Sequence, residues 1–287
     1  MRIGFVGAGK AGTSFGKYIA ERQPEGVSLS GYFSKSKGSA ESAAQLTGSA
    51  TFSSAARLAG ASDLIVFSVP DGVIGAAWET LRPHLKGRIA CHMSGSLGSD
   101  VFEGAAAAEV TVGSVHPLAA LFNRETAWQK LGSTWFSIEG DAAFLEAARR
   151  LLDALGNPYC EIAVGKKVLY HTASAVCSNL VCAVAYTAAE LYRSCGLPQD
   201  FAEKAWRPLF LENAKNVAAL GASAALTGPL ERGDADTIAN HLEALKEAPK
   251  AYRDAYIALS KILIDTAKEK HPDRDYGAIS AILDADD

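Results

Sequence analysis

The chain has 287 residues, which is long for one compact core and suits two domains. Apolar residues make up 48% and charged residues 21%, as in an ordinary soluble globular protein, and the formal net charge of −4 provides no basic field for nucleic acid. No uninterrupted apolar run reaches the roughly 18 residues of a bilayer-spanning helix, so we expect no membrane partner.

Cysteine usage indicates a reducing compartment. The chain has five cysteines but no CxxC pair and no Cys/His spacing that suits a metal, so we expect core packing and no metal site. A strand is predicted from residue 2 onward, so we expect no signal or transit peptide before it. These features predict a cytoplasmic protein.

The first half of the chain alternates strand-like and helix-like segments. Residues 2–7 (RIGFVG) form an unbroken apolar run, which is typical of a strand buried on both faces of a parallel sheet. Further strands are expected at residues 27–34, 63–69, 88–93, 110–115 and 135–139. Helices are expected at residues 10–22, 37–46, 53–58, from Pro70 onward and at 141–155. This alternation predicts an α/β fold with a doubly wound parallel sheet.

The second half of the chain reads as helical throughout. Residues 166–194 contain no Gly or Pro, which favours one long helix that Gly196 and Pro198 end. Further helices are expected at residues 199–220, 235–247, 249–269 and 275–283. The pattern predicts a dinucleotide-binding domain at 1–164 and an all-α domain at 165–287.

The motif Gly7-Ala8-Gly9-Lys10-Ala11-Gly12 directly follows the first strand and precedes an amphipathic helix. In this context GxGxxG is the fingerprint of a Rossmann-type dinucleotide site. Gly7 permits the tight turn, Gly9 lets the backbone approach the pyrophosphate, and Gly12 allows close packing of helix on sheet. The N-terminus of the helix supplies oriented N–H groups to the anion.

The end of the second strand bears on the kind of nicotinamide cofactor. An NAD site usually has an acidic residue there for the ribose 2′-hydroxyl, whereas this chain has Ser34, Lys35 and Ser36 and no carboxylate until Glu41. Neutral and basic groups can bind a 2′-phosphate that an acid would repel. We therefore predict NADP(H).

Three later strand ends carry further candidates. Ser68, Val69 and Pro70 end the strand at 63–69 and are expected to contact the cofactor, since ligands bind outside the carboxyl ends of parallel strands. His92 and Ser94 follow the next strand, and His116 follows the one after it. Each His is a candidate for proton transfer or substrate binding, or it bonds only the loop backbone.

Together these motifs resemble the Rossmann-like proteins that carry the domain of unknown function 2520, distant relatives of ketopantoate reductase and pyrroline-5-carboxylate reductase. The matching segments are Gly7–Gly12, 67–71, His92-x-Ser94-Gly95, His116-Pro117-Leu118, Tyr170-His171, Ser178-Asn179 and 225–234, with Thr237 and His241. The resemblance implies a Rossmann domain followed by a helical dimerisation domain. It does not imply a particular substrate.

The predicted long helix carries a polar stripe. Lys167, His171, Ala175 and Asn179 are spaced four apart and so lie on one face. In reductases of similar architecture this helix carries a catalytic Lys and an Asn. Aligning Asn179 with that Asn places His171 at the Lys position, which predicts that the family's lysine is missing here. A buried structural pair is the alternative for His171 and Asn179.

Arg232 lies in the loop that precedes the helix at 235–247, a position similar to the substrate-side loop of pyrroline-5-carboxylate reductases. A guanidinium there could bind a substrate carboxylate in a bidentate pair. A structural pairing of Arg232 with Asp234 is the alternative.

These observations predict an NADP(H)-dependent oxidoreductase that acts on a small carbonyl or imine compound, which could itself be a carboxylate. His116 or His171 would be the acid/base, and Asn179 and Ser94 would bond the reacting heteroatom. A non-catalytic NADP(H)-binding sensor, favoured by the missing lysine, and a deazaflavin cofactor are the alternatives. Surplus apolar stripes on the later helices predict a homodimer through the helical domain, unless they pack on the Rossmann domain.

Overall fold

The computed structural model describes residues 1–121 and 123–285. Contacts group the chain into two units, Met1–Ser178 and Asn179–Asp287. The sequence predicted a boundary between residues 164 and 165, whereas the contacts place it after Ser178. The difference arises because the first turns of the helix that begins at Lys167 pack on the first unit.

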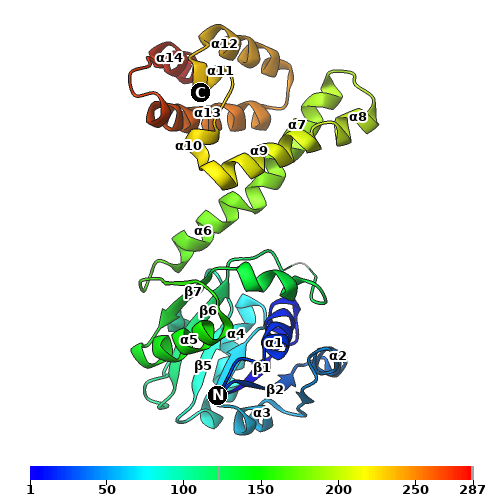
Figure 1. Cartoon of the computed structure of the whole chain (residues 1–287), viewed down its shortest axis with the longest axis vertical. Coiled ribbons are helices and arrows are strands. Elements are labelled where there is room, and N and C mark those ends of the chain that lie inside the picture. The colour runs from blue at the N-terminus through cyan, green and yellow to red at the C-terminus, as the bar shows by residue number, and fades with distance from the viewer. Residues whose placement is uncertain (122, 286–287) are drawn as a thin grey trace. The chain divides into compact units, whose positions relative to one another are not determined.

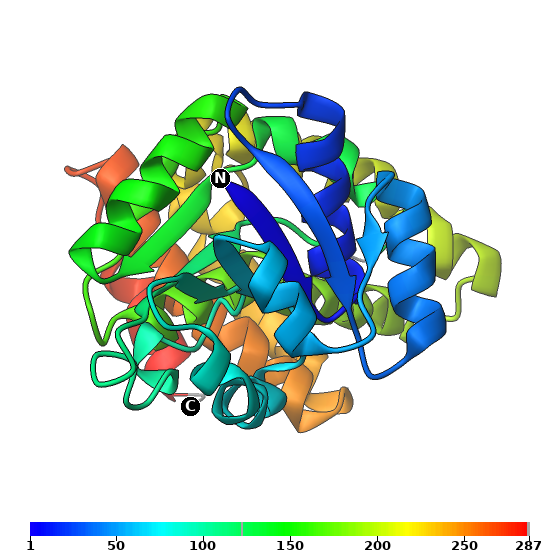
Figure 2. The same ribbon diagram turned by 90° about the horizontal axis from the view of Figure 1, so that it is seen from below.

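The first unit is built on an eight-stranded sheet with the strand order β3-β2-β1-β4-β5-β6-β7-β8 (Figure 1). The strands are β1 (Arg2–Val6), β2 (Ser28–Phe33), β3 (Ala50–Thr51), β4 (Leu64–Phe67), β5 (Ile89–His92), β6 (Thr111–Pro117), β7 (Phe136–Gly140) and β8 (Tyr159–Glu161). In Figure 2 the first two strands, in shades of blue, run side by side from the N-terminus. The strand order reverses beside β1, and such a switch point is where open α/β sheets bind ligands.

The predicted α/β fold is confirmed, and all six predicted strands are present. The sequence missed β3 and β8, which are too short to show a hydrophobic pattern. Two strands depart from the expected parallel sheet, because β7 pairs antiparallel with β6 and β8 runs in the same direction as β7. Among the residues that the structure describes between β6 and β7 there is a 3₁₀ turn but no α-helix, and β7 runs beside β6 in the opposite direction.

Helices cover both faces of this sheet. They are α1 (Lys10–Arg22), α2 (Lys37–Thr47), α3 (Ala55–Ala61), α4 (Asp71–Leu81) and α5 (Ala142–Leu155), with the 3₁₀ turns Arg82–His84, Ser99–Val101 and Ala127–Ser133. One apolar core lies on the side of α1, α2 and α5, and a second on the side of α3 and α4. The two cores hold the strands in a fixed register, which also fixes the positions of the residues at the ends of the strands.

The predicted long helix is divided in two. Helix α6 (Lys167–Cys177) and helix α7 (Asn179–Ser194) are separated by Ser178, whose backbone (φ −121°, ψ −73°) is not helical. Ser and Asn side chains compete with the helix for backbone hydrogen bonds, which favours a break at Ser178-Asn179.

The stretch Lys167–Ser194 is also long and apolar enough, by length and composition, to cross a membrane: an 18-residue window within it has a mean hydropathy of 1.5, and none of that window is buried. Polar residues such as His171 and Ser174 interrupt the stretch, so it contains no long unbroken apolar run. Core helices of soluble proteins pass the same test, so the finding by itself is weak support for a membrane span.

The second unit is helical, as predicted. Besides α7 it contains α8 (Gln199–Lys204), α9 (Arg207–Leu220), α10 (Ala222–Ala225), α11 (Pro229–Arg232), α12 (Ala235–Ala244), a 3₁₀ turn (Leu245–Glu247), α13 (Lys250–Lys270) and α14 (Gly277–Ala285). Residues 199–220 form two helices rather than one, because Pro208 starts a new helix at its first turn. An apolar core joins α11, α12, α13 and α14.

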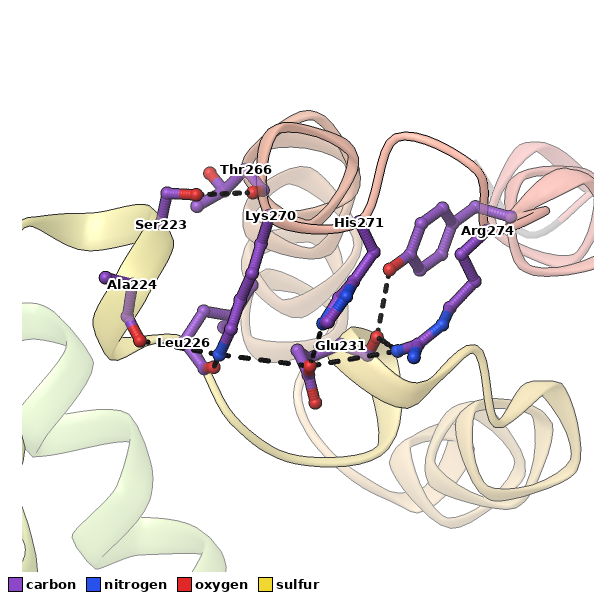
Figure 3. Close-up of polar contacts among 9 residues, drawn as sticks. Ser223, Ala224, Leu226, Glu231, Thr266, Lys270, His271 and Arg274 are labelled. Carbon is purple, nitrogen blue, oxygen red and sulfur yellow. Dashed lines mark hydrogen bonds and ion pairs between the residues drawn. The ribbon is translucent and has the colours of Figure 1, made fainter.

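In the second unit, Glu231 is the centre of a group of polar contacts beside the apolar core of α11 to α14 (Figure 3). Its carboxylate contacts His271 and lies 3.9 Å from Lys270 Nζ and 3.7 Å from Arg274 Nη1. Its backbone oxygen accepts a hydrogen bond from Tyr276 at 2.9 Å. The pKa of Glu231 is lowered, first by the hydrogen bond from His271. This residue of the 225–234 motif therefore joins α11 to the end of α13 and to the loop before α14.

Candidate functional site

The glycine loop between β1 and α1 has the geometry of an anion cradle. Gly7 adopts φ +100°, and a Cβ there would lie 2.7 Å from the Ser68 carbonyl oxygen, so only glycine fits. A Cβ on Gly12 would lie 2.1 Å from Ser68 Oγ, which explains the close approach of α1 to β4. Gly9 precedes α1 and has room for a Cβ within the protein, whose nearest neighbour would be 3.8 Å away. The space in front of Gly9 is thus left for a ligand.

A cavity of about 810 Å³ opens beside this loop. It is lined by the loop residues Gly7, Ala8 and Gly9, by the strand-end residues Ser34, Lys35, Ser68, Val69 and Pro70, and by apolar side chains of α3 and α4. Lys10, Ala11 and Gly12 form the first turn of α1, whose leading N–H groups have no partner within the helix. This combination of glycine cradle, helix N-terminus and apolar slot fits a dinucleotide.

The three residues predicted to select NADP(H) differ in their environment. Ser34 and Lys35 line the cavity. Ser36 instead caps α2, because its Oγ accepts hydrogen bonds from Ser39 N at 3.3 Å and from Ser39 Oγ at 3.0 Å. Ser39 lines the cavity and was not predicted. The hydroxyl of Ser36 is thus engaged by the helix, and Ser39 joins Ser34 and Lys35 at the cavity wall.

Polar side chains form a row across the neighbouring strands β5, β6 and β7, level with the carboxyl end of β5. His92 pairs with Ser114 in register, and Ser114 pairs with Glu139, so these three side chains lie on one face of the sheet. In the next row His116 pairs with Ser137. The sequence analysis named the two histidines but missed Glu139, because its strand was read only as a buried element.

The loop after β5 is held by carboxylates at both ends. Asp71, the first residue of α4, accepts hydrogen bonds from Ser94 Oγ at 2.7 Å and from Ser96 Oγ at 2.9 Å. Glu139 accepts hydrogen bonds from the backbone N–H of Ser99 at 2.9 Å and from Ser114 Oγ at 3.1 Å. The segment Ser94–Ser99 is therefore fixed over the row of polar side chains.

Two of the predicted site residues are engaged in holding this loop. His92 is fully buried; its Nδ1 accepts from the Ser94 N–H at 3.2 Å and its Nε2 lies 3.0 Å from the Gly98 carbonyl oxygen. Burial lowers the pKa of His92. Ser94 Oγ bonds Asp71 and the N–H groups of Ser96 and Leu97. Both polar groups therefore hold the loop in this structure, and substrate binding by His92 and heteroatom bonding by Ser94 stay predictions.

Lys167 is a residue that the sequence analysis did not name for the site. Its side chain is buried, with 2% of the residue exposed, and Nζ donates a hydrogen bond to the Ser94 carbonyl oxygen at 3.0 Å. Burial lowers the pKa of Lys167 to about 8, although the charges of Glu139 and Asp71 act in the opposite direction. A lysine with this pKa can bind and release a proton near neutral pH.

The alignment by Asn179 placed His171 at the position of the lysine of related reductases, and that assignment stays a prediction. One helical turn earlier, the structure buries a lysine, Lys167, against the loop after β5. Lys167 and His171 lie four residues apart on one face of α6, so the helical pattern alone could not tell them apart. Burial of Lys167 and the hydrogen bond to Ser94 distinguish them.

His116 lies beside Lys167 on the same face of the sheet. Its Nδ1 is 3.2 Å from the hydroxyl of Tyr170, and its ring centroid is 6.5 Å from that of His171. Burial, followed by the charge of Lys167, lowers the pKa of His116 to about 4. His116 is thus neutral at pH 7, which disfavours it as a proton donor but leaves it able to form hydrogen bonds. A Cβ on Gly95 would contact both histidines, so the glycine makes room for them.

Two predicted residues belong to the second unit. Asn179 begins α7 and is exposed. Arg232 ends α11, with 61% of its side chain exposed and its Nη2 4.0 Å from Asp234 Oδ2. Asp234 also caps α12 by accepting from the Thr237 N–H at 3.1 Å. The roles of Asn179 and Arg232 at the substrate stay predictions.

Two family models match the chain. Residues 1–117 match the Rossmann-like domain, and residues 134–262 match the Domain of unknown function (DUF2520). The predicted resemblance is confirmed. Among proteins with curated functions, none matches the chain significantly.

Solved structures share the fold over nearly the whole chain. A protein from Thermotoga maritima is 24% identical, with a TM-score of 0.73 over 93% of this chain and 99% of that one. A protein from Bacteroides fragilis described as a candidate NADP oxidoreductase is 25% identical, with a TM-score of 0.66 over 92% and 98%. An imine reductase from Myxococcus stipitatus in complex with NADP⁺ is 16% identical, with a TM-score of 0.64 over 99% and 100%.

Substitution of Gly9 tests the cradle. A Cβ at Gly9 meets little within the protein but projects into the space in front of α1. We expect Gly9→Ala to weaken NADPH binding by an order of magnitude or more, about 1.4 kcal/mol or above, while the melting temperature without cofactor changes little. Titration calorimetry and thermal unfolding measure the two quantities.

The matched control is Gly60→Ala, because Gly60 lies in α3 away from the cavity and a Cβ there has no neighbour within 4 Å. If Gly9→Ala binds NADPH as tightly as the parent protein does, the dinucleotide does not bind at the glycine loop.

Proposed function

We propose that the protein is an NADP(H)-dependent oxidoreductase that transfers a hydride to or from a small carbonyl or imine compound. The observation that carries this proposal is the buried Lys167 at the same edge of the sheet as the glycine cradle. A chain of contacts connects them: Pro70 lines the cavity, the adjacent Asp71 bonds Ser94, and the carbonyl of Ser94 accepts from Lys167.

The comparisons support the class of reaction. One similar structure is described as a candidate NADP oxidoreductase and another as an imine reductase with NADP⁺, while a variant of the latter is described with NAD⁺. These likenesses support an NAD(P)-dependent oxidoreductase. The preference for NADP(H) and the carbonyl or imine substrate rest on this chain's own residues.

When bound, NADPH supplies the hydride that reduces the substrate carbon. The protein must then deliver a proton to the heteroatom that gains the electron pair. Lys167 fits this role, because its ammonium is held by one neutral carbonyl and its pKa lies near neutrality. The proton passes from Nζ to the substrate oxygen or nitrogen, and solvent reprotonates the amine. Neutral His116, positioned by Tyr170, offers a hydrogen bond beside that proton.

The non-catalytic alternative loses its main support. A sensor was favoured because the family's lysine was thought to be missing, but Lys167 is buried at the site. Burying an ammonium in a protein is costly unless the group is used or strongly compensated. Reaction with a panel of cyclic imines, keto acids and aldehydes, followed by NADPH oxidation, tests the proposed activity directly.

Removal of the Lys167 amine tests its role. For a substrate found in that panel, we expect Lys167→Met to reduce kcat by about 10²–10⁴-fold, the usual contribution of a positioned acid, with little change in NADPH affinity. In the parent protein the rate of reduction should fall as pH rises through about 8, since Lys167 must be protonated to act. Stopped-flow and steady-state pH profiles measure both effects.

Lys166→Met is the matched control, because this neighbouring lysine is exposed. If Lys167→Met and the parent protein reduce the substrate at equal rates, another group donates the proton.

Substitution of Ser34 tests the cofactor preference. Since Ser34 and Lys35 line the cavity where a ribose-binding acid would stand, NADPH should bind at least tenfold more tightly than NADH, about 1.4 kcal/mol. Ser34→Asp should erase or reverse that ratio by repelling the 2′-phosphate. Ser28→Asp, at the opposite end of β2, should leave it unchanged. Equal affinities for the two cofactors in the parent protein would contradict the NADP(H) proposal.

We also propose that the partner of the helical unit is a second copy of the chain. Large apolar side chains are exposed on α7 and α9, at Leu180, Val184, Tyr186, Leu209, Leu211, Val217 and Leu220. Helices with apolar residues on more than one face bury the second face against another element. The interspersed polar residues of α7 and α9, such as Glu190, Glu212 and Lys215, favour a protein partner over a lipid one.

Sedimentation equilibrium tests the oligomeric state. We expect a mass near twice the 30.1 kDa of the chain at micromolar concentration. A Leu209→Glu, Leu220→Glu variant should shift the protein toward the monomer. A parent protein that stays monomeric would favour packing on the Rossmann domain, and flotation of the protein with liposomes would favour a membrane.

A further inference from the structure

Glu139 is a buried carboxylate that the proposed proton transfer does not use. It lies on β7 with 2% of the residue exposed. Its hydrogen bonds come from neutral donors: Oε1 accepts from Ser99 Oγ at 2.6 Å, and Oε2 accepts from Ser99 N at 2.9 Å and from Ser114 Oγ at 3.1 Å. Burial of a carboxylate costs free energy even when neutral groups donate hydrogen bonds to it, so we expect this carboxylate to serve a function.

The contacts of Glu139 lead to Lys167 through the Ser94–Ser99 loop. Glu139 fixes the loop at Ser99, His92 Nε2 fixes it at Gly98, and Asp71 fixes it at Ser94. The carbonyl that receives the Lys167 hydrogen bond belongs to this same loop. Movement of the loop would therefore leave the buried ammonium without its acceptor.

Glu139 and Lys167 also interact through charge. The carboxylate is the largest electrostatic influence that favours the protonated form of Lys167, ahead of Asp71. No direct bond between the two is needed, because charges interact over several ångströms where water is excluded.

We propose that Glu139 is a positioning residue for the reaction: its carboxylate fixes the Ser94–Ser99 loop that holds Lys167, and its negative charge keeps the Lys167 amine protonated for transfer. This inference rests on the proposed function in one respect only, that Lys167 is the proton donor. The link between Glu139 and Lys167 can be measured without substrate or cofactor.

Seven titratable groups interact with Lys167 or share its face of α6, and they must be considered together. They are Asp71 on α4, His92 on β5, His116 on β6, Glu139 on β7, Cys160 on β8, and Tyr170 and His171 on α6 itself. Burial lowers the pKa of His92, and it lowers the pKa of His116 to about 4. Burial lowers the pKa of Lys167, and the charges of Glu139 and Asp71 raise it. When the charge of Glu139 is removed, Asp71 is the main charge that still opposes the effect of burial, so the pKa of Lys167 should fall below about 8.

The experiment is competitive labelling of lysine amines in the intact protein with acetic anhydride over a range of pH, read for the Lys167 peptide by mass spectrometry. In Glu139→Gln we expect the midpoint of Lys167 labelling to move to lower pH by about one unit, the size expected for loss of a nearby opposite charge. With a substrate in hand, the alkaline limb of the rate profile should move by the same amount. Glu146→Gln, an exposed residue of α5, is the control and should move neither.

Two further variants separate charge from position. Ser99→Ala removes the hydroxyl bond to Glu139 and keeps the backbone N–H bond and the carboxylate, so the loop is held less firmly and kcat should fall while the Lys167 midpoint stays. Glu139→Asp keeps the charge on a shorter side chain and should also lower kcat with little change in the midpoint. These variants carry the test if Glu139→Gln does not fold, which thermal unfolding reveals.

The outcomes are distinguishable from failure of the proposed function. An unchanged Lys167 midpoint in folded Glu139→Gln overturns the inference, even where Lys167→Met abolishes turnover. If the midpoint moves but no substrate of the panel is reduced, the coupling between the residues stands and the proposed function fails. If Ser99→Ala and Glu139→Asp both leave kcat unchanged, Glu139 does not position the loop.

Discussion

The hydrogen bond from the Lys167 ammonium to the Ser94 carbonyl is the interaction on which the site depends. A buried cation must keep a partner, and this one has its acceptor in the loop after β5. The requirement brings the start of α6 against the loop after β5, and all of this helix belongs to the Rossmann unit rather than to the helical one. The same requirement explains why the loop is fixed at both ends, by Asp71 and by Glu139.

Most of the fold could be predicted because its signals are local. The glycine loop needs a positive φ at Gly7 and close packing at Gly12, and both needs are visible in the sequence as glycine. The six longer strands show as apolar runs. Strands β3 and β8 do not, since pairs of two or three residues are set by neighbours in the sheet rather than by their own pattern. The antiparallel direction of β7 likewise depends on the path of the chain between 118 and 135.

The site was predicted less well, because its residues are brought together by register between strands. Periodicity placed Lys167 and His171 on one face of a helix, but burial distinguishes them, and burial depends on the sheet edge that α6 meets. Strand ends correctly drew attention to His92 and Ser94, yet both are engaged by their own loop. Glu139 gave no signal in the sequence, since an acid at the end of an apolar strand is ordinarily exposed.

The distribution of charge around Lys167 suits a group that must both hold and release a proton. A carboxylate in direct contact would favour the ammonium so strongly that the proton would be hard to give up. Here the contacting atom is a neutral carbonyl, while Asp71 and Glu139 bond the loop on either side of it. Burial then lowers the pKa of Lys167, and the two carboxylates limit the decrease to about 8. A donor is most effective when its pKa lies near the working pH, and this arrangement reaches that range by balance rather than by a direct ion pair.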